Sequence, residues 1–260
     1  MKKSLLIVVA VLSTFSILAV DYFNENPKVT SGDRCSLKKS DTSTLIEQDP
    51  EFHYAIGNRF SNTITLEALL EAKIVDDLIA ADAMNSVVSM WEVKLMVLSN
   101  KKDKIEKGED RALTDAQLGI LQSLDYNSDC NITALCTLKN VQSGQLTEGY
   151  FDDYFTVIPE KEARYNGGEN AVIDYLVSKS SELTKKVDQD QLKAGMIRFV
   201  VTKEGAITHV SLDTSCGYRS IDKALINLVK EMPQKWTPAE NATGEKVDQE
   251  LVLFYGLVGC

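Results

Sequence analysis

The sequence predicts an α+β fold, in which a C-terminal three-stranded sheet with two helices follows a β-rich mixed domain and an apolar N-terminal segment. Two patterns indicate the C-terminal part. Residues 196–202 alternate as a strand, and Gly205 then permits a tight turn into a second strand at residues 206–213. The next segment carries apolar residues at helical spacing, namely Ile221, Ala224, Leu225, Leu228 and Val229.

The composition is that of a globular protein with an acidic surface. The 260 residues are enough for one large or two modest domains, and 44% are hydrophobic while 25% are charged. The net charge is −10. Because a phosphate-binding surface needs clustered Lys and Arg, this charge argues against nucleic acid as a partner.

The N-terminus predicts export. Lys2 and Lys3 precede residues 5–20, which include no charged side chain. As a helix this run is about 24 Å long, which is long for a signal peptide and short for a membrane span. We expect residues 1–20 to be either an uncleaved signal anchor in the inner membrane or a signal peptide that is removed from a soluble periplasmic protein. Residues 21–48 are polar and predict a tether.

A β-rich domain is predicted at residues 49–160. Strand character appears at residues 86–99, 130–141 and 150–158, and a charged turn region covers residues 101–111. Thr114 is suited to cap a short helix that extends to Leu124, and Asp115 lies near the positive end of that helix. Strands joined by hairpins around one helix predict a small mixed or sandwich domain.

A second domain is predicted at residues 162–260, with the order α–β–β–α–β. Its first helix covers residues 169–179, Ser220 caps the second helix, Pro233 ends that helix, and residues 247–255 form the last strand. This order gives a three-stranded sheet with the helices packed on one face.

The sequence predicts no catalytic residues, no metal site and no cofactor. The two histidines, His53 and His209, have no nucleophile motif nearby. Ser215–Cys216–Gly217 has the residue types of a nucleophile turn, but no general base can be identified for it. The sequence also lacks a Cys-x-x-Cys pair and a phosphate-binding Gly-rich loop. We therefore expect a binding protein rather than an enzyme.

Five short motifs stand in order along the second domain. They are Tyr165–Asn166–Gly167–Gly168–Glu169, Phe199–Val200–Val201 with Glu204–Gly205, Ile221–Asp222 with Ala224–Leu225, Met232–Pro233 with Trp236–Thr237–Pro238–Ala239, and Gly244–Glu245 with Val247. Together they resemble the TonB C-terminal domain family, in the form common among Bacteroidota, over residues 162–256. In the first domain, Thr65–Leu66–Glu67–Ala68, Leu113–Thr114–Asp115–Ala116–Gln117 and Thr156–Val157–Ile158–Pro159 resemble a periplasmic domain of the GldM gliding and secretion proteins.

The resemblance implies a cell-envelope energy transducer for transmembrane transport. Proteins of this family are anchored in the inner membrane, receive energy from the ExbB–ExbD proton channel, and bind outer-membrane TonB-dependent receptors across the periplasm. Their last strand accepts a receptor segment as an added strand, because an exposed sheet edge offers unpaired N–H and C=O groups. In this sequence the resemblance places partner binding at Arg164, Tyr165, Gln249, Glu250, Val252 and Phe254, whereas Leu251 and Leu253 are expected in the core.

Three departures from the family pattern favour a second hypothesis. A folded domain stands where the family has a Pro-rich spacer, residues 5–20 lack the membrane His used in coupling, and Asn166 replaces the usual Pro after Tyr165. The alternative is therefore a structural or assembly component of the envelope, related to secretion or gliding. A strand-swapped homodimer is a further alternative for the use of the last strand.

Overall fold

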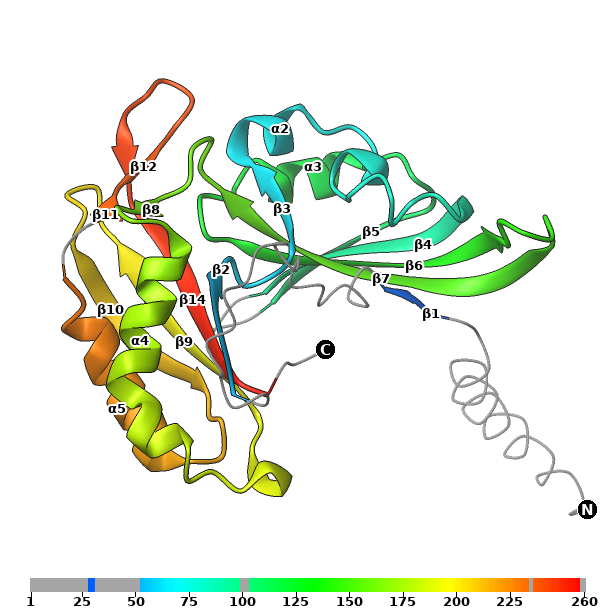
Figure 1. Ribbon diagram of the computed structural model, residues 1–260. Helices are drawn as coiled ribbons and strands as arrows, with labels where there is room; N and C mark the ends of the chain where they lie inside the picture. The colour runs from blue at the N-terminus through cyan, green and yellow to red at the C-terminus, as the bar shows by residue number, and fades with distance from the viewer. Residues whose placement is uncertain (1–27, 31–51, 99–102, 234–235, 258–260) are drawn as a thin grey trace, which may run out of the picture.

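The computed structural model describes residues 28–30, 52–98, 103–233 and 236–257, and these form two packed units (Figure 1). Unit 1 has a hydrophobic core between Ile64 and Val157. Unit 2 has a separate core that joins Phe52 to residues between Ala163 and Tyr255. The predicted α+β class is confirmed, because each unit combines a sheet with helices.

Unit 1 is built on a six-stranded sheet. Its strand order is β1 (Lys28–Thr30), β7 (Leu146–Ile158), β6 (Asp129–Lys139), β4 (Val87–Leu98) and β5 (Lys104–Gly108), and β3 (Asn62–Thr65) also pairs with β7. The strands β1 and β3 run parallel to β7, and the other pairs are antiparallel. The predicted tether at residues 21–48 therefore contributes a strand at Lys28–Thr30, and its other residues lie outside the described ones.

Short helices cover one face of the unit 1 sheet (Figure 1). They are α2 (Leu66–Glu71), the 3-10 helix η2 (Val75–Asp77) and α3 (Asp115–Leu121). The predicted cap of α3 is confirmed, because the Thr114 hydroxyl accepts a hydrogen bond from the Gln117 amide and the Gln117 side chain accepts one from the Thr114 amide. The predicted turn at residues 101–111 is wrong, since the charged segment Lys104–Gly108 forms an exposed edge strand.

Unit 2 has a four-stranded antiparallel sheet rather than the predicted three strands. The strand order is β10 (Ile207–Thr214), β9 (Ala194–Val201), β14 (Gln249–Gly256) and β2 (His53–Gly57). The fourth strand, β2, comes from the sequence that we assigned to the first domain. The predicted boundary at residues 49–160 is therefore wrong at its start, because β2 and Phe52 belong to the sheet and core of unit 2.

Two helices cover one face of this sheet, α4 (Glu169–Thr184) and α5 (Arg219–Lys230) (Figure 1). The apolar stripe predicted for α5 is buried at Ile221, Leu225 and Val229. Its cap differs from the prediction: Tyr218 precedes the helix without a side-chain cap, and Ser220 lies inside the first turn. The remaining elements are η3 (Gln189–Gln191) and two small ribbons, β8 (Arg164–Tyr165) with β11 (Trp236–Thr237) and β12 (Ala239–Glu240) with β13 (Lys246–Val247).

The predicted membrane segment at residues 1–20 lies outside the described residues. Among the helices that are described, none is long and apolar enough to cross a membrane.

Candidate partner-binding site

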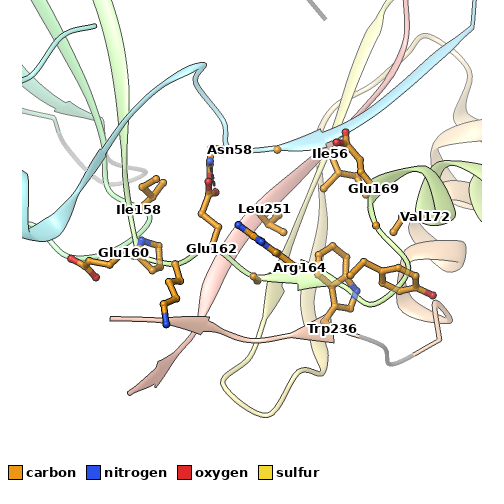
Figure 2. Close-up of a pocket in the computed structure, with 16 residues that line it drawn as sticks. Ile56, Asn58, Ile158, Glu160, Glu162, Arg164, Glu169, Val172, Trp236 and Leu251 are labelled. Atoms are coloured by element: carbon orange, nitrogen blue, oxygen red, sulfur yellow. Dashed lines mark hydrogen bonds between the residues drawn. The ribbon is translucent and has the colours of Figure 1, made fainter. Parts of the chain in front are cut away.

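A pocket of about 520 Å³ opens where the chain passes between the two units (Figure 2). Its walls come from the end of β2, the segment from Ile158 to Tyr165, the start of α4, and Trp236 with Leu251. These parts are far apart in the sequence, so the pocket forms only when unit 2 has folded and the connection from β7 has packed against it.

A network of amide and carboxylate groups holds one wall of the pocket. Glu162 Oε2 accepts hydrogen bonds from Asn58 Nδ2 at 2.7 Å and from Gln249 Nε2 at 3.0 Å. Gln249 also accepts a bond from the Ala163 amide at 2.7 Å and is fully buried. One glutamine therefore connects β14 with the β2–β3 connection and with the entry to β8.

Aromatic and apolar side chains form the opposite wall. The rings of Tyr165 and Trp236 meet edge to face with their centroids 5.4 Å apart, and Phe199 supports Trp236 from the core at 5.8 Å. The Trp236 indole N–H is buried and has no acceptor among the described residues. Val172 and Leu251 complete the apolar surface.

Arg164 and Tyr165 are the two predicted partner-binding residues that line the pocket. Arg164 is exposed, and Figure 2 shows its side chain pointing toward the side where Asn58 and Glu162 lie. Its position on β8 is fixed because β8 pairs with β11, with Tyr165 opposite Trp236 and Arg164 opposite Thr237. The pocket thus offers a cation, aromatic edges and an apolar surface to one bound segment.

The predicted open edge at β14 is occupied, which corrects our expectation for the other residues. Strand β2 pairs with β14 from Val252 opposite Gly57 to Gly256 opposite His53, so Phe254 is opposite Ala55. Val252 is buried, and Gln249 is buried behind the pocket wall, where it bonds to Ala163 and Glu162. The Glu250 amide donates to Asn127 Oδ1 of unit 1 at 2.7 Å. A partner strand could therefore pair with β14 only after β2 had left it.

A cluster of charges joins the two units beside β14. We call it the seam cluster; it consists of Arg59, Asp129, Arg198, Asp213 and Glu250. Arg59 lies 3.3 Å from Asp129 of unit 1 and 3.8 Å from Asp213 of unit 2. Arg198 pairs with Asp213 at 2.8 Å and lies 3.9 Å from Glu250.

Two carboxyl groups of the seam cluster bind protons more tightly than usual. Burial raises the pKa of Asp129, against the hydrogen bond from Thr156 and the charge of Arg59. Burial likewise raises the pKa of Glu250, against the charge of Arg198. Desolvation exceeds the stabilisation by the arginines in both cases.

The Ser215–Cys216–Gly217 segment is a structural turn. Cys216 is fully buried, and burial raises the pKa of its thiol to about 12, which keeps it protonated at neutral pH. The nearby Asp222 carboxylate accepts bonds from the Ser215 hydroxyl at 2.6 Å, the Tyr255 hydroxyl at 2.7 Å and the Cys216 amide at 3.1 Å. Asp222 therefore serves the packing of α5 on the sheet.

Sequence reasoning missed Asn58, Glu162 and the seam cluster apart from Glu250. A single polar residue between two elements has no periodicity that would mark it, and its partners are distant in the chain. Trp236 stood in one of the motifs, but its place in the pocket wall depends on pairing between β8 and β11. Comparison of the chain with protein-family models, with curated proteins and with solved structures gives no match.

Proposed function

We propose that this chain is a cell-envelope protein that binds a periplasmic or outer-membrane partner through unit 2, in the manner of a TonB C-terminal domain. The observation that carries the proposal is the pocket at the junction of the units, where Arg164 and Tyr165 lie beside Trp236. The partner is an outer-membrane TonB-dependent receptor or another envelope protein, and an extended segment of it enters the pocket.

The chemistry of the pocket suits a peptide segment. Arg164 can pair with an acidic side chain, and Tyr165, Trp236 and Val172 can receive an apolar one. Strand addition to β14 would then extend from the pocket, once β2 is displaced. In this proposal the protein performs no catalysis and needs no cofactor.

Energy transduction is part of the same proposal. Residues 1–20 would link the protein to the inner membrane as a signal anchor, where ExbB–ExbD would drive it for transmembrane transport. If those residues are removed as a signal peptide, the protein would act as a soluble periplasmic module.

One observation favours the alternative, a structural or assembly component of the envelope that acts in secretion or gliding. Unit 1 is a folded body bound to unit 2 through the Arg59 ion pairs and the Asn127–Glu250 hydrogen bond. A flexible spacer would need no such attachment, whereas a rigid two-unit body suits a fixed place in a machine.

Site-specific crosslinking in cells tests the proposal. A photoreactive amino acid at Tyr165 should capture an outer-membrane receptor, because Tyr165 lines the pocket. The matched control carries the probe at Lys223, which is exposed on α5 and away from the pocket lining. A second protein with Arg164→Ala beside the Tyr165 probe should lose most of the captured receptor.

The identity of the captured protein separates the two functions. Capture of a secretion or gliding component in place of a receptor would favour the assembly role. Equal capture at Tyr165 and Lys223, or capture only of a second copy, would contradict partner binding at the pocket.

A further inference from the structure

The hairpin of β6 and β7 extends beyond the other strands of the unit 1 sheet. Pairing between β4 and β6 ends at Val87 and Leu138, while β6 and β7 remain paired as far as Lys139 and Leu146. Figure 1 shows this end of the sheet on the side of unit 1 that lies away from unit 2. We call residues 140–146 the hairpin tip.

The hairpin tip is an ordered turn that presents aliphatic side chains to solvent. The Asn140 side-chain oxygen accepts hydrogen bonds from the Gln142 amide at 3.0 Å and from the Ser143 amide at 2.8 Å. Val141 is 77% exposed and Leu146 is 56% exposed. The turn therefore holds both side chains away from the core of unit 1.

The surroundings of these side chains are apolar or polar without charge. Residues 140–147, between Lys139 and Glu148, include no charged side chain. Val88 is also exposed and follows Val87 at the base of the hairpin tip, so three aliphatic side chains gather at this end of the sheet. Such a surface can enter the headgroup layer of a bilayer without burying a charge.

Strand β1 determines the direction from which the N-terminal segment enters unit 1. It runs parallel to β7, with Lys28 opposite Tyr150 and Thr30 opposite Asp152. The N-terminal end of β1 therefore points toward the start of β7, and so toward the hairpin tip. Along β7, Leu146 lies about 13 Å from Tyr150.

The length of the preceding chain limits the distance from β1 to the predicted membrane segment. Residues 21–27 separate the apolar run at residues 5–20 from Lys28. Fully extended, a chain of this length spans at most about 28 Å. An anchor at residues 5–20 therefore keeps the hairpin-tip end of unit 1 within reach of the bilayer surface.

We propose that the hairpin tip rests on the periplasmic face of the inner membrane, where Val141 and Leu146 enter the headgroup layer of the phospholipid bilayer. This contact rests on the proposed function, because it needs residues 1–20 to be the membrane anchor. A few aliphatic side chains bind a bilayer weakly on their own, but an anchored chain presents them at an effective concentration on the order of millimolar. Anchor and hairpin tip together would hold unit 1 in one orientation, with unit 2 directed into the periplasm.

Quenching of a fluorophore by nitroxide-labelled lipid tests this contact. The full chain, with residues 1–20 in place, is reconstituted into vesicles of phosphatidylethanolamine and phosphatidylglycerol that contain the labelled lipid. The fluorophore is attached at Gln142→Cys in the hairpin tip, or at Ala242→Cys on the exposed β12–β13 hairpin of unit 2 as the control. A third protein carries it at Asn24→Cys, close to the apolar run, to report insertion of the anchor.

The natural cysteines do not interfere with this labelling. Cys35→Ser and Cys260→Ser are introduced in all proteins. The remaining cysteines, Cys130, Cys136 and Cys216, are buried.

We expect labelled lipid to quench the fluorophore at Gln142 at least threefold more than the one at Ala242. Val141→Asp with Leu146→Asp should reduce the quenching at Gln142 to the level at Ala242, because carboxylates oppose entry into the bilayer.

A matched double variant controls for the added charge. Leu183→Asp with Leu212→Asp places two carboxylates at exposed apolar positions of unit 2 and should leave the quenching at Gln142 unchanged. Circular dichroism verifies that both double variants are folded.

Equal quenching at Gln142 and Ala242 would overturn the proposal, as would quenching that persists in the folded Val141→Asp, Leu146→Asp protein. A spectral shift at Gln142 that occurs without lipid quenching and disappears on dilution would show that a second copy covers the hairpin tip, which also overturns the proposal. Absence of quenching at Asn24 would reject the anchor and the contact together. Receptor capture retained at Tyr165 with an unquenched hairpin tip would reject the membrane contact and leave the pocket function standing.

Discussion

Asp222 shows how a single buried charge is stabilised in unit 2. It is 3% exposed and receives three hydrogen bonds, from Ser215, Cys216 and Tyr255. Burial alone would raise the pKa of Asp222, but the hydrogen bonds from Ser215, Tyr255 and Cys216 outweigh it and lower the pKa. The carboxylate therefore stabilises the folded state above its unfolded-state pKa, and this stabilisation is lost as the pH falls through the lowered value.

Replacing this carboxylate should destabilise the protein. We expect Asp222→Asn to reduce the free energy of unfolding by about 1–3 kcal/mol at pH 7, because the amide cannot accept all three bonds. The difference from the unchanged protein should shrink below about pH 4, where the unfolded-state carboxyl is protonated. Urea unfolding at pH 7 and pH 3 measures both effects. The exposed Asp174→Asn is the control, and an equal loss there would contradict the role of Asp222.

At the scale of elements, the sequence pattern correctly predicted those features that depend only on residues close together in the chain. The stripe of α5, the Thr114 cap of α3 and the hairpin at Gly205 depend on neighbouring residues, and each is present. Strand β5 was missed because its charged residues, the exposed Lys104 and Lys107 and the half-buried Glu106, lie at a sheet edge, where polar side chains are favoured. Ser220 was mistaken for the cap because α5 already begins at Arg219, directly after Tyr218, so Ser220 is the second residue of the helix.

Two glycines should respond in opposite ways to alanine. Gly205 has φ +79°, and an added Cβ would lie 2.5 Å from the Trp236 carbonyl oxygen. Gly119 lies within α3, is exposed, and has open space around its Cα. We expect Gly205→Ala to lower the free energy of unfolding by more than about 1 kcal/mol. Gly119→Ala should raise it by about 0.5–1 kcal/mol.

Thermal and urea unfolding of the two variants measure these changes side by side. Each variant is the control for the other, since both add one methyl group. Destabilisation of equal size at both positions would contradict the helical environment of Gly119.

At the scale of the whole molecule, the arrangement of the units could not be predicted from the sequence. Phe52, Tyr54 and Ile56 alternate with smaller or polar residues, but a run this short does not identify its partner strand, which lies at the other end of the chain. For the site, Arg164 and Tyr165 were indicated by the resemblance, but the second half of the pocket needs Asn58 and Glu162 from elsewhere. Pairing over such distances depends on tertiary packing.

The seam cluster should make stability depend on pH through Glu250. Its pKa is raised by burial, so the folded state holds that proton more tightly than the unfolded state does. Its contribution to stability therefore declines as the pH rises from the unfolded value of about 4.3 toward the folded one. Glutamine does not titrate, so the free energy of unfolding of the Glu250→Gln variant minus that of the unchanged protein should increase as the pH rises from 4 to 7.

Urea unfolding at pH 4, 5.5 and 7 gives this comparison. Glu204→Gln, at an exposed turn position, is the control and should show no such trend. A difference between Glu250→Gln and the unchanged protein that stays constant with pH would contradict the assignment.

Strands β2 and β14 are neighbours in the sheet but lie near opposite ends of the sequence, and this separation determines when they can pair during synthesis. The ribosome releases β2 early, yet the residues between Gly57 and Gln249 take roughly 10–40 s to translate. Apart from β1, the strands and helices of unit 1 lie within that interval, so most of unit 1 can fold first. In any polypeptide that ends before Gln249, β14 is missing and β2 has no strand to pair with. Tyr54 and Ile56 then remain exposed to solvent, where chaperones and proteases can bind them.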